Sequence, residues 1–237
     1  MKQLVNNVFL VLGDSFGDGY NCNSYLIKSN EEILLIDTGL GQFNFFGSPS
    51  RRDPLEIFNL VVTENIQSMN MIAITHAHLD HTGGIGSIDS NLRKHLIVGC
   101  HRSEKPHLEE GDTSYIDPIT RMNGPKIQID KTLSHGDHIV VGDLKFEVIH
   151  TAGHTEGSLC LYEPEKKWLF SGDTVFPEGS FGRVDFPGSN SDDMISSLDI
   201  LRSLEVSALF AGHMESIIGP EVKNSLNESY RVAKQIL

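Results

Sequence analysis

The hydrophobic positions of this chain form short apolar runs, separated by clusters of glycine, asparagine and acidic residues. Short apolar runs bounded by turn-forming residues are typical of β-strands. The pattern predicts strands at residues 8–12, 24–27, 33–36, 71–75, 96–98, 168–170 and 208–211. Residues 132–163 continue the pattern as a meander, with turns at residues 135–136 and 142–143. The chain is therefore expected to be rich in β-structure.

Helical spacing of apolar residues occurs in only a few segments. Asp53 and Pro54 form a start signal for a helix over residues 55–67. Residues 192–204 form an amphipathic helix pattern, and the tail after Pro220 predicts a final helix. Residues 103–125 are polar and irregular, and we expect an insertion without regular structure there.

The order of these elements predicts two mixed sheets packed together with helices outside, as a single domain over residues 1–237. Strand-like runs close at Thr75, Thr151, Gly172 and Gly212, and each is followed within three positions by His or Asp. Four strand ends of this kind can converge on one edge of a sandwich. We therefore expect the functional site at that edge.

Composition narrows the function classes. The 237 residues carry a net charge of −13, and the longest basic cluster is the pair Arg51 and Arg52. Electrostatic binding of nucleic acid needs a basic surface, so a nucleic-acid partner is not expected. The three cysteines are far apart, and no apolar stretch reaches 18 residues. These features favour a cytoplasmic protein that binds no membrane.

The densest chemical signal is a run of four ligand-type residues in six positions, HAHLDH at residues 76–81. His76 and His78 alternate on an extended segment, so both can project to the same side and hold one metal ion. Asp80 and His81 follow where Gly83 and its neighbour turn the chain, and they can face a second ion. The run indicates a metal centre.

Together with the surrounding sequence, THAHLDHTGG at residues 75–84 resembles the HxHxDH signature of the metallo-β-lactamase superfamily. Four further segments resemble motifs of that family in the same order: IDTG at 36–39, TAGHTEGS at 151–158, SGDTVF at 171–176 and AGH at 211–213. Ala152 replaces the usual proline of the second of these. The resemblance covers almost the whole chain and implies an α+β fold with four layers, helix, sheet, sheet and helix.

The resemblance also implies a set of metal ligands. His76, His78 and His154 would bind one ion, and Asp80, His81 and His213 a second. Asp173 would bridge the pair. Two divalent metals are then expected, zinc first, with iron or manganese as alternatives.

Two aspartates have further roles in this interpretation. Asp80 would also orient and polarise the attacking water. Asp37 would accept a hydrogen bond from a ligand histidine, although an ordinary turn aspartate before Gly39 is the alternative. The remaining histidines have no partner at ligand spacing, and we expect none to bind metal: His95, His101, His107, His135, His138 and His150.

The segment GSFGRVDFPG at residues 179–188 is similar to a stretch of short glyoxalase II-like hydrolases. This similarity implies a small-molecule thioester as the substrate, and an anionic thioester is compatible with it. Arg183 is the candidate for binding a substrate carboxylate, and a surface pair with Asp185 is the alternative. Phe176, Phe181 and Phe186 are candidates for an apolar pocket, or for core packing. We expect no counterpart of the C-terminal helical domain of longer glyoxalase II enzymes, so S-lactoylglutathione is one expected thioester among several.

Other activities remain open at this point. A persulfide dioxygenase of the same fold, with a single iron, is the main alternative. A lactonase, a nuclease and a non-catalytic binding module are further alternatives, and a homo-oligomer is compatible with the sequence.

Overall fold

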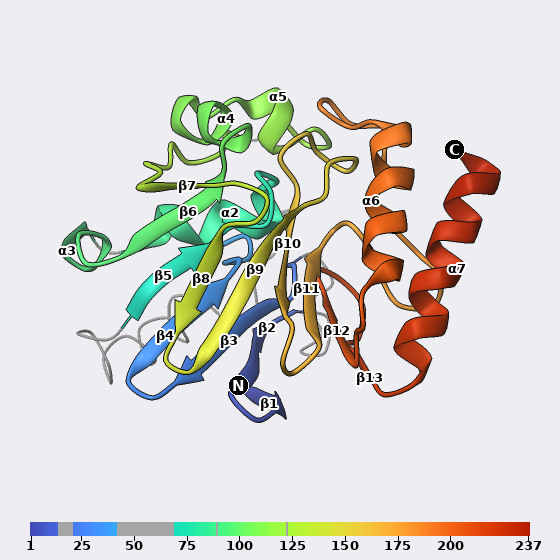
Figure 1. Ribbon diagram of the computed structural model, residues 1–237. Coiled ribbons are helices and arrows are strands. Elements are labelled where there is room, and N and C mark those ends of the chain that lie inside the picture. The colour runs from blue at the N-terminus through green and yellow to red at the C-terminus, as the bar shows by residue number, and fades with distance from the viewer. Residues whose placement is uncertain (14–20, 42–68, 89, 122) are drawn as a thin grey trace.

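The computed structural model describes residues 1–13, 21–41, 69–88, 90–121 and 123–237, and within these ranges two β-sheets lie face to face (Figure 1). The first sheet has seven strands, in the order β1 (Lys2–Val5), β2 (Val8–Leu12), β3 (Ser24–Ser29), β4 (Glu32–Ile36), β5 (Met69–Ala73), β6 (Ile97–His101) and β7 (Lys131–Leu133). Strands β4 to β7 pair in parallel and β1 to β4 are antiparallel. The sheet is therefore mixed.

The second sheet has six strands, in the order β13 (Ile217–Ile218), β12 (Ala208–Ala211), β11 (Trp168–Gly172), β10 (Leu159–Glu163), β9 (Leu144–His150) and β8 (His138–Val141). Only β11 and β12 pair in parallel. This arrangement confirms the expected pair of mixed sheets.

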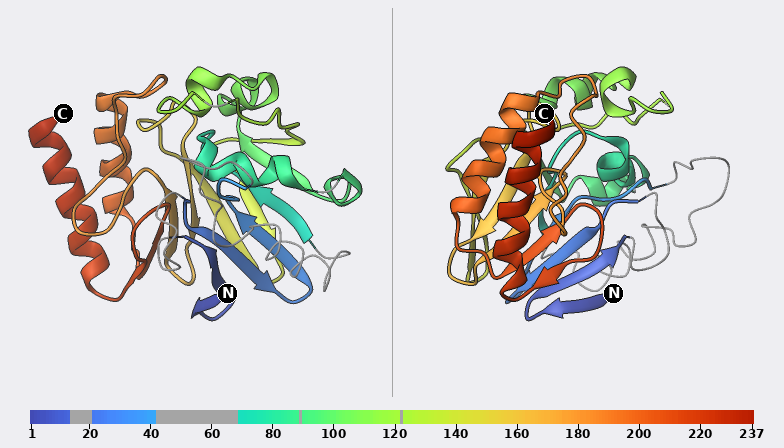
Figure 2. Two further views of the ribbon diagram at one scale, coloured as in Figure 1. Left: turned by 180° about the vertical axis from the view of Figure 1, so that it is seen from behind. Right: turned by 90° about the vertical axis from the view of Figure 1, so that its right-hand side faces the viewer.

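The helices cover the two outer faces. One group consists of α2 (Leu79–Thr82), the 3₁₀ turn η3 (Gly83–Ser87), α3 (Ser90–Arg93), α4 (Glu104–Glu110) and α5 (Thr113–Ile116). The other group consists of α6 (Ser191–Ser203) and α7 (Glu221–Ile236), which lie side by side against the second sheet (Figure 2). Within the described ranges, no helix combines the length and apolar character needed to cross a membrane.

Three separate apolar layers hold this arrangement together. The layer between the sheets includes Phe146, Phe170 and Phe210, all fully buried. A second layer joins the first sheet to helices α2, α4 and α5, and a third joins the second sheet to α6 and α7. Strands with apolar side chains on both faces are expected in sheets covered on both sides. The four layers are those that the family resemblance implied.

Hydrogen bonds tie the sheets together at the edge where β5, β9, β11 and β12 end. The Tyr25 hydroxyl donates to the carbonyl of Ala211 at 2.7 Å, and the Asn23 side-chain amide donates to the same carbonyl at 3.0 Å. The backbone N–H of Leu159 donates to the carbonyl of Thr75 at 3.0 Å. The strand ends that carry the predicted ligands are thereby held beside one another.

Two expectations from the sequence were wrong in part. Residues 103–125 are not irregular throughout, because they contain α4 and α5. These helices have seven and four residues, which is too short for helical periodicity to stand out. Residues 132–163 do not form one meander, because β7 pairs with β6 in the first sheet. The helix expected at residues 55–67 lies outside the described residues.

Candidate metal centre

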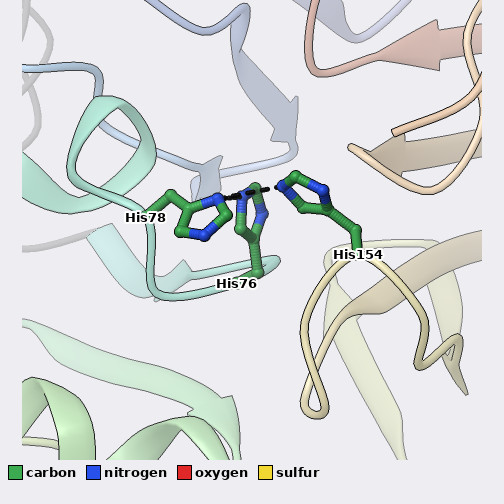
Figure 3. Close-up of side chains that lie close together, drawn as sticks. All are labelled: His76, His78 and His154. Carbon is green, nitrogen blue, oxygen red and sulfur yellow. Dashed lines mark hydrogen bonds between the residues drawn. The ribbon is translucent and has the colours of Figure 1, made fainter. Parts of the chain in front are cut away.

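Three imidazoles meet at the edge of the sandwich, and their nitrogens point at one another (Figure 3). His76 and His78 lie on the segment that follows β5, and His154 lies on the loop that follows β9. The Nδ1 atom of His78 is 3.1 Å from Nε2 of His76 and 2.9 Å from Nε2 of His154. All three side chains are buried. Three nitrogens this close form one face of a metal-coordination sphere.

A second group of donors lies beside the first. Asp80 and His81 are on the short helix α2, and His213 follows β12. The Oδ2 atom of Asp80 is 3.1 Å from Nε2 of His213 and 3.7 Å from Nε2 of His81. This mixed set of nitrogen and oxygen donors could hold a second ion.

Asp173 lies between the two groups, directly after β11. Its Oδ1 atom is 3.3 Å from Nε2 of His81, while Oδ2 is 3.6 Å from Nε2 of both His154 and His213. The two carboxylate oxygens therefore face both groups at once. The structure thus brings together all seven residues that the sequence singled out as ligands.

The outer nitrogens of these imidazoles have defined partners. His154 Nδ1 donates to the carbonyl of Arg183 at 2.8 Å, which leaves Nε2 free to coordinate. His81 Nδ1 lies 2.8 Å from Oδ2 of Asp37, and that carboxylate also accepts hydrogen bonds from the backbone and hydroxyl of Thr75. Partners of this kind fix the tautomer and the ring orientation of a ligand histidine.

Electrostatics prepare the three-histidine group for a cation. Burial lowers the pKa of His76, His78 and His154, and that of His78 falls to about 3. Neighbouring imidazoles lower the pKa of His76 and His78 further. These rings are therefore neutral at physiological pH, with lone pairs available for coordination.

The second group is charged as it stands. Burial lowers the pKa of His213, but Asp173 and Asp80 outweigh it and raise the value to about 9. Burial would raise the pKa of Asp173, but His213 and His81 hold it well below its usual value. A metal ion at this position would replace the proton on His213 and take over its charge.

Unpaired polar atoms show that the donor set fits a metal. Nε2 of His81 and Oδ1 of Asp173 are buried, and among the described residues neither has a hydrogen-bond partner, although the two atoms lie 3.3 Å apart. Buried polar groups are normally satisfied, so such atoms need an explanation. Cations between the imidazoles and the carboxylates would supply it.

The sequence did not indicate Cys22 as a member of the centre. Its thiol sulfur and the ligand atoms of Asp37 and His81 all lie within 4.8 Å of one another. Burial raises the pKa of Cys22 to about 11, so the sulfur is a protonated thiol at neutral pH. Only thiolates coordinate metal well. A lone cysteine has no spacing signal, and nothing in its sequence context indicated this position.

A cavity of about 520 Å³ opens onto the metal centre. Its floor includes His78, Asp80, Asp173 and His213. The rest of its lining is largely apolar and includes Ile116, Pro118, Ile119, Phe176, Phe181 and Phe186. The predicted pocket residues Phe176 and Phe181 therefore line this cavity. The contribution of residues 116–120 was not foreseen, because they belong to the polar segment 103–125, whose sequence predicts no pocket wall.

Arg183 also lines the cavity, but its charge is already paired. Its guanidinium makes two hydrogen bonds to Asp185, at 2.9 and 2.6 Å, and lies 4.2 Å from the ring centre of Phe186. Both charged side chains are about 60% exposed. The surface ion pair of Arg183 with Asp185, which was the alternative to substrate binding, is therefore present at the mouth of the cavity.

The other histidines lie outside the metal-capable groups of the described residues. His101 and His150 stack on each other with ring centres 4.0 Å apart, and His107 stacks on Tyr115 at 3.6 Å. His107 also contacts Asp112.

A four-layer sandwich with His and Asp donors at one edge defines a class of metal-dependent proteins, and the family comparison agrees. The family model described as the metallo-beta-lactamase superfamily matches residues 17–213. The chain belongs to this superfamily, and the family and the donor cluster together imply divalent metal ions.

Particular relatives support a metal-dependent hydrolase. The chain is 30% identical to hydroxyacylglutathione hydrolase GloC of Haemophilus influenzae, over 67% of this chain and 75% of the relative. It is 28% identical to acyl-coenzyme A thioesterase MBLAC2 of Bos taurus, over 86% of this chain and 75% of the relative. Among solved structures, TTHA1623 in a di-iron-bound form is 28% identical, with a TM-score of 0.67 and coverage of 92% and 96%.

Proposed function

We propose that this protein is a thioester hydrolase that uses two metal ions. The observation that carries the proposal is the position of Asp173, whose two oxygens face two separate donor groups at the floor of a largely apolar cavity. Relatives named as a hydroxyacylglutathione hydrolase and an acyl-coenzyme A thioesterase support a thioester substrate.

The donor groups divide the ligands between two ions. His76, His78 and His154 would hold the first, while Asp80, His81 and His213 would hold the second, and Asp173 would contact both. Zinc suits this mixture of nitrogen and oxygen donors, and manganese and iron are alternatives. The di-iron form of the similar solved structure supports considering iron.

Bound metal ions would supply a water molecule acidic enough to attack near neutral pH and would polarise the thioester carbonyl. Asp80 would orient that water. Its carboxylate lines the cavity, and His81 and His213 hold its pKa at about 2 against the effect of burial. It therefore stays ionised and can accept a hydrogen bond from the attacking water.

The cavity wall suits the acyl part of a thioester. Its aromatic and aliphatic side chains would exclude water from the reacting carbonyl and bury an apolar acyl group. Arg183 is placed at the mouth, where it could exchange Asp185 for a substrate anion. The thiol part of the substrate would extend toward solvent at that end.

The test combines metal analysis with substrate turnover. Protein purified without added metal is analysed for bound metal, and a panel of S-lactoylglutathione and acyl-coenzyme A thioesters is assayed. About two metals per chain with thioester turnover would support the proposal. One iron per chain with oxygen uptake would instead indicate the persulfide dioxygenase.

Two variants check the ligand assignment in the same assays. Asp173→Ala should remove most of the activity and most of the bound metal, because it removes the carboxylate that faces both groups. His138→Ala, on an exposed strand position, should change neither. Equal losses in the two variants would contradict the assignment.

A further inference from the structure

Glu104 is a fully buried carboxylate outside the set of ligands. It is the first residue of helix α4, just after β6, and its side chain is inaccessible to solvent. Within the described part of the chain it has no ion pair with a cation. Burying a charged group without a counter-ion is costly, and burial indeed raises the pKa of Glu104. The contacts of the Glu104 carboxylate should therefore explain why a charged group is buried at this position.

The carboxylate accepts hydrogen bonds from two loops that carry metal ligands. Its Oε2 atom accepts from the backbone N–H of Ala77 at 2.7 Å, and its Oε1 atom accepts from the backbone N–H of Gly157 at 2.8 Å. Ala77 lies between His76 and His78, and Gly157 lies three residues after His154.

These two loops belong to different sheets. The loop of Ala77 follows β5 in the first sheet, and the loop of Gly157 connects β9 and β10 in the second. Glu104 therefore bridges the sheets beside the three imidazoles. Tyr115 completes its partners by donating its hydroxyl to Oε1 at 3.0 Å, and the Thr155 side chain also donates.

The approach of the loop to the carboxylate leaves no room to spare. A Cβ atom at Gly157 would lie 2.5 Å from Oε1 of Glu104 and 2.6 Å from its Cγ atom. Glycine is thus the residue that lets the backbone N–H reach the carboxylate. The Gly157 end of the bridge is therefore adapted to the carboxylate.

We propose that Glu104 is a positioning residue that sets the spacing between the His76–His78 segment and His154, and thereby the metal affinity of the three-histidine group. It touches no ligand side chain and acts through the backbone on either side. The inference rests on the proposed function only in taking these three histidines as ligands.

The test variant is Glu104→Gln, which keeps the shape of the side chain and removes its charge. A glutamine has one oxygen, so its NH₂ group must face one of the two backbone N–H donors, and one loop loses its anchor. Glu110→Gln, on the exposed end of the same helix, is the matched control for the loss of charge. Tyr115→Phe removes one donor and keeps both backbone contacts.

Zinc affinity is measured by competition with a chromophoric chelator, and the visible spectrum of cobalt-loaded protein reports the coordination geometry. Losing a partner that orients metal ligands typically weakens metal affinity roughly 10- to 100-fold. We expect a loss of that size in Glu104→Gln, with an altered cobalt spectrum and a lower kcat. Glu110→Gln should match the wild type, and Tyr115→Phe should lose less than Glu104→Gln.

A folded Glu104→Gln protein with wild-type zinc affinity and an unchanged cobalt spectrum would overturn the inference. If that variant does not fold, amide hydrogen exchange of the wild-type protein and of Glu104→Asp decides instead. The shorter side chain should speed exchange at Ala77 and Gly157 more than at Ile74, and equal exchange would overturn the inference. Failure of the wild-type protein to bind metal would refute the proposed function itself.

Discussion

Asp37→Asn should weaken metal binding at the second position, formed by Asp80, His81 and His213, and leave binding at the three-histidine group unchanged. Asp37 has a φ of 57°, in the left-handed region, where asparagine and aspartate are the side chains best tolerated. The substitution therefore changes the chemistry of the side chain without adding backbone strain. Its Oδ2 atom contacts Nδ1 of His81 at 2.8 Å and accepts from the Thr75 hydroxyl at 2.7 Å, while Oδ1 accepts from the Thr75 backbone.

The magnitude follows from the number of acceptors. An asparagine oxygen can replace Oδ1 and keep the Thr75 backbone bond, but its NH₂ group then faces Nδ1 of His81. His81 must then move its proton to Nε2, the nitrogen that points to Asp80 and Asp173. That proton competes directly with a metal ion. We expect metal affinity at the second position to fall about 10- to 100-fold, which is about 1.4 to 2.8 kcal/mol.

The assay is a zinc titration that resolves the two binding events, run on the wild-type protein, Asp37→Asn and the control Asp143→Asn. Asp143 is an exposed aspartate in the turn between β8 and β9, away from the centre. In Asp37→Asn the binding event of the three-histidine group should be retained, and the event of the second position should shift. Two events within twofold of the wild-type constants would refute the tautomer argument.

Two further outcomes are expected. Burial and His150 lower the pKa of His101 to about 4, so the folded state excludes a proton that the unfolded chain binds below about pH 6.5. The stabilisation from neutral His101 is complete above that pH and is lost as pH falls toward 4. In urea unfolding of the metal-free protein, the free energy of unfolding between pH 7 and 5 should therefore fall less in His101→Gln than in the wild type, by about 1 kcal/mol or less. Parallel losses in the two proteins would contradict this. Gly182→Ala places a Cβ 1.9 Å from the backbone oxygen of Asp173 and should lower kcat at least about tenfold. The control Gly136→Ala has open space around its Cβ and should lower only the stability, by about 1 kcal/mol. Equal kcat values in these two variants would refute the steric argument.

The sequence predicted the strand ends and the clustering of the His and Asp donors because both produce local signals. Thr75 ends an apolar run and stands directly before His76, so the strand and the ligand segment are adjacent in the chain. The seven donors then follow at the spacing of the family motifs, and together they define the centre. The layers also followed, because apolar runs of strand length must be covered on both faces.

Other parts of the centre gave no such signal. Glu104 acts through backbone N–H groups of Ala77 and Gly157, 27 and 53 residues away, and every residue type except proline has such an N–H. The wall at residues 116–120 depends on where short helices place Ile116 and Ile119. Such contacts come from tertiary packing, which periodicity and composition do not encode.

The hydrogen bond from His154 to residue 183 uses the main-chain carbonyl, while the side chain of the same residue faces the mouth of the cavity. Orientation of the imidazole is therefore independent of which side chain stands at position 183. Under the proposed function, replacements at this position should therefore change substrate preference without disturbing the ring that the backbone holds. Natural divergence or design at position 183 would then alter the substrate and leave the metal chemistry in place.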